Sequence, residues 1–90
     1  MNERCTVRYS GHVQGVGFRA TVHDLAARFA VAGFVQNLPN GGVLLTAEGE
    51  STELEHFLHA VRITLERYID AADMQSGHAT GEWKRFTIKY

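Results

Sequence analysis

The residues best suited to chemistry lie in one short segment, GHVQGVGFRA, at positions 11–20. Gly15 and Gly17 allow the backbone to curl so that successive N–H groups converge. A helix that begins here would add unpaired N–H donors and a favourable dipole. Arg19 offers a planar guanidinium that suits two phosphoryl oxygens. The segment therefore predicts a phosphate site, and a tight turn before a surface arginine is the equally compatible alternative.

Two familiar phosphate-binding motifs do not fit this segment. Ala20 stands where a dinucleotide-binding fingerprint needs its third glycine, and the Gly-Lys-Ser/Thr of a nucleoside triphosphate loop is missing. Cys5 lies fourteen positions before Arg19 (19 − 5), too far for a phosphocysteine mechanism. Any phosphate site here must therefore depend on backbone amides and the arginine.

Asn37, in the segment VQNLPNGG, is the second polar candidate. A carboxamide both donates and accepts hydrogen bonds, so it could hold a water molecule beside a bound phosphate. The alternative is a turn asparagine with no chemical role. Nothing in the spacing requires Asn37 to lie near the 11–20 segment, so their closeness is itself a prediction.

Regular elements must position these candidates, and apolar periodicity predicts where those elements lie. The expected elements are a strand over 5–13, a helix from Phe18 that stops near Gly33, strands over 34–38 and 43–49 joined by a hairpin at Asn40-Gly41, a helix begun by a Thr52–Glu55 capping box, a weaker strand over about 68–75, and a closing strand over 85–90 with Phe86, Ile88 and Tyr90 inward.

This order predicts an α+β fold. Two βαβ-like halves that share one sheet form a ferredoxin-like split β-α-β sandwich. The sheet is expected to be mixed but rich in antiparallel pairs, with four to five strands and both helices on one face. Ninety residues leave room for a single domain, residues 1–90.

Composition narrows the possible partners. A formal net charge of −1 provides no basic field for nucleic acid. No apolar run approaches a membrane span, and MNERCTVRYS lacks the apolar part of a signal peptide. The single cysteine, Cys5, excludes an internal disulfide and is typical of a reducing compartment. These features predict a cytoplasmic protein with no nucleic-acid or membrane partner.

The segments GHVQGVGFR and GFVQNLPNGGVLLTAEG, taken together, strongly resemble those of the acylphosphatases in motif, spacing and order. The resemblance covers nearly the whole chain and continues into the closing FTIKY. It implies a hydrolase that cleaves the carboxyl–phosphate bond of small acyl phosphates to a carboxylate and inorganic phosphate. It also implies an enzyme without metal or cofactor, and the small size suits a monomer.

The resemblance also implies roles for particular residues. Arg19 would bind the phosphoryl group, and Asn37 would orient the attacking water. The backbone amides of the preceding loop would bind the same group; they belong to Gln14, Gly15, Val16, Gly17 and Phe18. The family usually has a Gly-Pro-Pro-like loop after the second helix, which this chain lacks, so the bounds and pairing of the next strand are left open.

The expected chemistry suits this inventory, because an acyl phosphate releases a weakly basic carboxylate and needs no general acid. Phosphoryl transfer of this kind depends mainly on positioning and charge stabilisation. Two rival functions stay open. One is a module that keeps the phosphate cradle without turnover. The other is an RNA-binding ferredoxin-like domain, against which the net charge of −1 and the missing RNP-like string argue.

Overall fold

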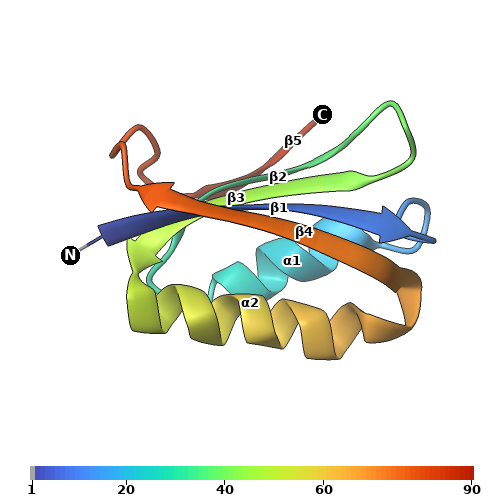
Figure 1. Ribbon diagram of the computed structural model, residues 1–90, viewed down its shortest axis with the longest axis horizontal. Helices are drawn as coiled ribbons and strands as arrows, with labels where there is room; N and C mark the ends of the chain where they lie inside the picture. The colour runs from blue at the N-terminus through green and yellow to red at the C-terminus, as the bar shows by residue number, and fades with distance from the viewer. Residues whose placement is uncertain (1) are drawn as a thin grey trace.

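The computed structural model describes residues 2–90, which form one sheet and two α-helices (Figure 1). The elements are β1 (Asn2–Gly11), α1 (Phe18–Ala26), β2 (Ala32–Asn37), β3 (Val43–Glu50), α2 (Ser51–Leu65), the 3-10 helix η1 (Glu66–Tyr68), β4 (Ile69–His78) and β5 (Phe86–Lys89). Within residues 2–90, no helix is long and apolar enough to cross a membrane.

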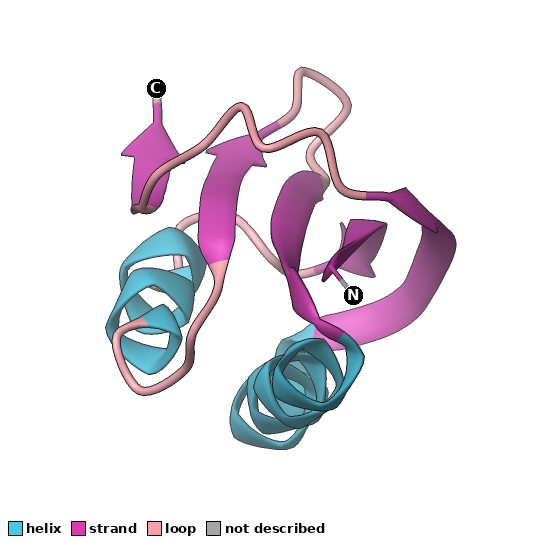
Figure 2. Ribbon diagram, turned by 90° about the vertical axis from the view of Figure 1, so that its left-hand side faces the viewer, coloured by secondary structure: helices cyan, strands magenta, loops and turns pink. Residues whose placement is uncertain are grey.

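The five strands lie side by side in the order β4-β1-β3-β2-β5. Neighbouring strands are antiparallel except β2 and β5, which are parallel. Both helices cover the same face of the sheet, and the β4–β5 connection crosses the other face (Figure 2). The predicted ferredoxin-like α+β sandwich is confirmed, with β5 as the fifth strand.

The core lies between the sheet and the two helices. Alternation along β1 and β3 turns one side chain in two toward the helices, and α1 and α2 each bury a stripe of helical period. Phe57 of α2 is completely buried and packs against the rings of Phe29 and Phe86. Burial of one such side chain stabilises the fold by roughly 1.5–3 kcal/mol. This core holds in place the ends of the strands at which the candidate residues lie.

The first helix is shorter than predicted, and Gly33 does not stop it. α1 ends at Ala26, whereas Gly33 lies inside β2 at a φ of 145°. A Cβ at Gly33 would lie 1.9 Å from the carbonyl oxygen of Thr46. The glycine therefore permits the close approach of β2 to β3, a tertiary role that the sequence pattern does not reveal.

The predicted capping box at the second helix is wrong. Glu50 is the N-cap of α2, and no side chain caps it. The polar residues of the first turn bind other elements instead: the Ser51 hydroxyl donates to the Glu3 carboxylate, and Glu53 accepts from the Ala30 N–H at 2.8 Å. The start of α2 is thus held by tertiary bonds to β1 and to the α1–β2 loop.

The closing strand also differs from its prediction. Phe86 is buried and Ile88 is partly buried, as expected, but Tyr90 is 94% exposed. The last paired residue of β5 is Lys89, opposite Gln36. Because Tyr90 lies beyond the paired strand, the alternation no longer directs its side chain into the core.

Candidate active site

The loop between β1 and α1 has the curled backbone that its glycines predict. Gly15 and Gly17 both adopt a φ of 78°, a left-handed conformation that other residues rarely adopt. Gly17 is the N-cap of α1, and the first helical hydrogen bond runs from the Thr21 N–H to its carbonyl. No side chain caps this helix. The first N–H groups of α1 therefore stay available to an external acceptor.

The sheet order brings the end of β2 to this loop. β1 and β2 are both antiparallel to β3, so their carboxyl ends lie at the same edge of the sheet. Val43, the first residue of β3, pairs with Tyr9 of β1 on one side and with Asn37 of β2 on the other. Tyr9 and Asn37 therefore lie two strand spacings, about 10 Å, apart. The 11–20 segment begins two residues after Tyr9, so it starts at the same end of the sheet as Asn37.

A small cleft of about 180 Å³ lies at this edge. Its walls include both side-chain candidates, Arg19 and Asn37, each half-buried. Of the predicted loop residues, three line the cleft and two do not. Those lining it are Gly15, Gly17 and Phe18, whereas Gln14 and Val16 do not contribute to its walls. The remaining lining residues are Val13, Ala20, Ile88 and Tyr90.

Gln14 has a side-chain function that sequence reasoning missed. Its Nε2 donates to the carbonyl of Leu38 at 2.8 Å and to the carbonyl of Gly42 at 2.9 Å. These carbonyls bound the β2–β3 turn, and Leu38 directly follows Asn37. One side-chain amide thus ties the glycine loop to the segment that carries Asn37. The only signal in the sequence is a carboxamide with two donors among glycines.

Tyr90 is a second unforeseen component of the cleft. The guanidinium carbon of Arg19 lies 5.0 Å from the centre of the Tyr90 ring, a cation–π distance. Within residues 2–90, no carboxylate pairs with Arg19. The arginine therefore keeps its positive charge uncompensated by an acid, which favours an anion in the cleft.

The cleft holds one positive side chain and no acidic one, because its nine lining residues include neither Asp nor Glu nor His. Elsewhere in residues 2–90, no three His, Cys, Asp or Glu side chains gather as metal ligands would. Chemically, the arrangement offers an anion site formed by a guanidinium and backbone N–H groups, with an amide beside it.

Comparisons with known proteins identify the family. A sequence model of the acylphosphatase family matches residues 5–88. An acylphosphatase of Lactobacillus johnsonii is 34% identical over 87 residues, which cover 94% of this chain and 96% of that protein. An acylphosphatase of Geotalea uraniireducens is 36% identical over 91 residues and the full length of both chains.

Solved structures lead to the same family. The crystal structure of acylphosphatase from Bacillus subtilis superposes with a TM-score of 0.88 at 29% identity, covering 98% of this chain and 99% of that one. Fold, family match and relatives thus coincide over nearly the whole length. The chain belongs to the acylphosphatase family.

Proposed function

We propose that this acylphosphatase holds the phosphoryl group of an acyl phosphate with Arg19 and the 14–19 loop amides, and that Asn37 orients the attacking water. The observation that carries the proposal is the shared cleft: Arg19 and Asn37 line it together with Gly15 and Gly17. The reaction converts a small acyl phosphate and water into a carboxylate and inorganic phosphate.

Arg19 and the loop supply the electrostatic part. The guanidinium binds two of the three terminal phosphoryl oxygens, and the backbone N–H groups of residues 14–18 also donate to the phosphoryl oxygens at the positive end of α1. The transferring phosphoryl group spreads negative charge over these oxygens, so preorganised donors stabilise it without rearrangement. Arg19 is supported in this role because no acid neutralises it within residues 2–90.

Asn37 supplies position. Its carboxamide oxygen accepts a hydrogen bond from a water molecule and aims the water's oxygen at the phosphorus. As the new P–O bond forms, one proton of the water passes to a phosphoryl oxygen of the substrate, so both water protons stay with the phosphate. The bond from phosphorus to the carboxyl oxygen breaks, and its electron pair leaves with the carboxylate. A carboxylate is a weak base and departs unprotonated, so a cleft walled without Asp, Glu or His suffices.

Gln14 keeps these two parts at a fixed separation. Its bonds to the carbonyls of Leu38 and Gly42 join the phosphate loop to the turn that follows Asn37. A displacement of about 1 Å between reacting groups lowers the rate by up to about a hundredfold. We therefore give the Gln14 side chain a positioning role: it touches neither substrate nor water, whereas the backbone amide of Gln14 belongs to the phosphate loop.

We also propose that residues 1–90 act as one monomeric domain in the cytoplasm. Cys5 is buried and forms no disulfide within residues 2–90, which supports a reducing compartment. An acyl phosphate small enough for a cleft of about 180 Å³ is the expected partner. No cofactor enters the proposed steps.

The proposal is tested by continuous assay of benzoyl phosphate hydrolysis with chelator present. The unaltered chain should turn over well above background, Arg19→Ala should not, and Arg28→Ala should match the unaltered chain as a control at an exposed arginine. Binding of inorganic phosphate without turnover would instead favour the non-catalytic module. Loss of activity on chelation would contradict the metal-free mechanism.

A further inference from the structure

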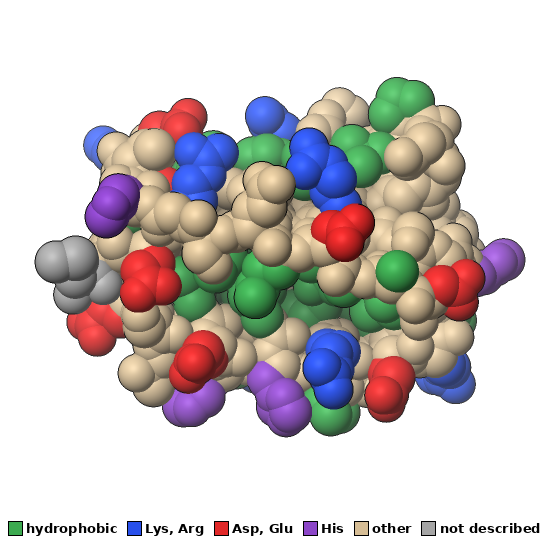
Figure 3. Space-filling model, in the orientation of Figure 1, with side chains coloured by type: hydrophobic (Ala, Val, Ile, Leu, Met, Phe, Trp, Pro, Cys, Tyr) green, Lys and Arg blue, Asp and Glu red, His purple; other side chains and the backbone are tan. Residues whose placement is uncertain are grey.

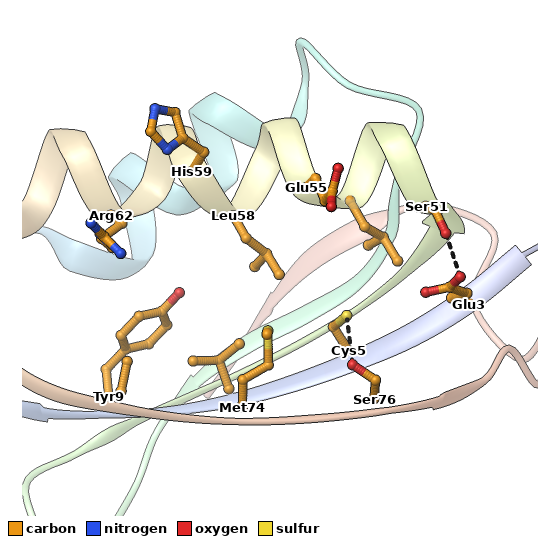
Figure 4. Close-up of a pocket in the computed structure, with 13 residues that line it drawn as sticks. Glu3, Cys5, Tyr9, Ser51, Glu55, Leu58, His59, Arg62, Met74 and Ser76 are labelled. Atoms are coloured by element: carbon orange, nitrogen blue, oxygen red, sulfur yellow. Dashed lines mark hydrogen bonds between the residues drawn. The ribbon is translucent and has the colours of Figure 1, made fainter.

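A second and larger cleft, of about 480 Å³, lies between α2 and the strands β1 and β4 (Figure 4). In the space-filling view it forms a hollow with apolar side chains at its base, above a row of charged and histidine side chains (Figure 3). It shares no lining residue with the cleft that holds Arg19. Its volume lies within the range of small-molecule sites.

The composition of β4 explains why this space is not filled. Ala72, Met74 and Ser76 line the cleft and pair with the inward residues Tyr9, Val7 and Cys5 of β1. Ala72 and Ser76 are small, so the edge strand cannot reach across to α2. Leu54 and Leu58 complete an apolar wall on the helix side.

The hydroxyl of Tyr9 opens into this cleft without a partner. The Tyr9 side chain is only 4% exposed, and its hydroxyl points toward α2 (Figure 4). The hydroxyl oxygen forms no hydrogen bond with any residue of 2–90, and it is not enclosed, because no buried side-chain oxygen or nitrogen in these residues lacks a partner. Burial raises the pKa of Tyr9, so the hydroxyl is a donor at neutral pH. The hydroxyl therefore faces the open space of the cleft, where it can donate to a bound acceptor.

The cleft is electrically polarised along its length. Arg62 lies on α2 at the same end as Tyr9, and no carboxylate pairs with it within residues 2–90. Glu55 and the hydrogen-bonded pair of Glu3 and Ser51 lie toward the opposite end. An anionic group is therefore favoured beside Arg62 and disfavoured at the far end.

We propose that this cleft binds an apolar monocarboxylate, with the carboxylate between the Tyr9 hydroxyl and Arg62 and the apolar body along Val7, Leu58 and Met74. The acceptor oxygens match the hydroxyl donor and the guanidinium. The apolar body covers the small residues of β4 that leave the space open. A second carboxylate would meet the acidic end, so dicarboxylates are excluded. The proposal does not depend on the roles of Arg19 and Asn37.

The test is a titration of the full chain, labelled with ¹⁵N, with sodium octanoate below its micelle-forming concentration. We expect saturable shifts in the backbone signals of Tyr9, Leu58 and Met74, with the signals of Gly15 and Gly17 unchanged. Octan-1-ol has the same chain without the carboxylate and should bind about tenfold more weakly. Equal binding of the alcohol, or shifts confined to the glycine loop, would overturn the proposal.

Variants identify the contacts. Tyr9→Phe removes only the hydroxyl and keeps the ring, and Arg62→Gln removes only the charge; each should weaken octanoate about tenfold. Ala72→Leu should abolish binding because it fills the cleft. Arg67→Gln is the matched control, since Arg67 lies just after α2, stacks on Tyr68 and does not line the cleft.

Unchanged affinity in both Tyr9→Phe and Arg62→Gln would refute the assignment. Unchanged binding in Arg19→Ala would separate this site from the catalytic one, and lost binding there would contradict it.

Discussion

Two loops at opposite ends of the sheet each form hydrogen bonds with one side chain from another segment, and these two side chains differ in charge. At the Val43 end, the neutral amide of Gln14 donates to two carbonyls of the β2–β3 turn. Near the other end of β3, Glu48 accepts from the N–H groups of Thr80 and Gly81, at 2.7 and 2.9 Å, and from the Thr80 hydroxyl. The two fastenings lie about 17 Å apart along the strand.

The difference matches what each end must do. A carboxylate at position 14 would lower the positive potential that Arg19 and the loop present to a phosphate. A neutral amide ties the loop without that cost. At the far end no anion has to bind, and a charged acceptor holds the β4–β5 connection strongly. We therefore expect catalysis to depend on the Gln14 end alone, and the pH dependence of stability to depend on the Glu48 end.

Arg19→Ala should have the largest effect on the catalytic end. Among residues 2–90, Arg19 is the one charged side chain that lines the cleft, and its removal should lower kcat/KM for benzoyl phosphate by about a thousandfold or more. Arg19→Lys should rescue little of this loss, because an ammonium lacks the planar fork. Stopped-flow or continuous assay measures both variants. Full rescue by lysine would show that charge alone suffices.

Asn37→Ala should have the next largest effect, and it should act on turnover. We expect kcat to fall about a hundredfold through loss of the oriented water, with the affinity for inorganic phosphate nearly unchanged. Steady-state kinetics with phosphate as a competitive inhibitor separates the two quantities. Weakened phosphate binding at normal kcat would assign Asn37 to binding instead.

Gln14→Ala should lower kcat about tenfold by loosening the loop from the turn. Gln14→Glu should be worse at neutral pH, because its carboxylate faces two carbonyl oxygens, and kcat should recover as the pH is lowered and the acid becomes a donor. Asn40→Ala is the matched control: it removes the 2.9 Å bond from the Gly42 N–H to Asn40 Oδ1 but leaves the Gln14 bonds intact.

Comparison with Asn40→Ala decides whether Gln14 has a specific positioning role. If Asn40→Ala lowers kcat as much as Gln14→Ala, the turn needs only general stability, and Gln14 has no special positioning role. If Gln14→Ala lowers kcat by the same factor in an Asn37→Ala background, Gln14 acts through the phosphate loop and not through Asn37.

Glu48→Gln should leave kcat unchanged and lower the free energy of unfolding by about 1–2 kcal/mol at neutral pH. Burial works to raise the pKa of Glu48, but the bonds from Thr80 and Gly81 and the charge of Arg4 outweigh it and hold the pKa below its ordinary value of 4.5. The stabilisation is therefore complete above pH 4.5 and is lost as the pH falls toward the folded-state pKa.

Denaturant unfolding at a series of pH values checks this prediction. Below pH 4.5, the ordinary pKa of the Glu48 carboxyl, the free energy of unfolding should fall more steeply with pH in the unaltered chain than in Glu48→Gln. Parallel pH profiles for the two proteins would mean that the Glu48 fastening carries no pH dependence.

The fold was predictable where local patterns decide the structure. Alternation in β1, the period of α1 and the φ of 78° at Gly15 and Gly17 all agree with the residues themselves. The predictions were wrong where a residue distant in sequence determines the local structure. Gly33 looks like a helix stop, but its small size serves the approach of Thr46 on the next strand.

The candidate site was predictable in its residues but not in its assembly. The neighbourhood of Arg19 and Asn37 depends on β3 lying between β1 and β2, which local patterns do not specify. The Gln14 bonds depend on the same arrangement, since their acceptors are backbone carbonyls of a turn 24 and 28 residues away. Tyr90 was misplaced because the alternation was extended past the last paired residue.

Calorimetric titration of inorganic phosphate into the unaltered chain, Arg19→Ala and Asn37→Ala tests the division of roles most directly. We predict that Arg19→Ala loses measurable phosphate binding, whereas Asn37→Ala binds phosphate with nearly unaltered affinity while hydrolysing benzoyl phosphate poorly. Normal phosphate affinity in Arg19→Ala would contradict the account, because the anion would then be held without the guanidinium.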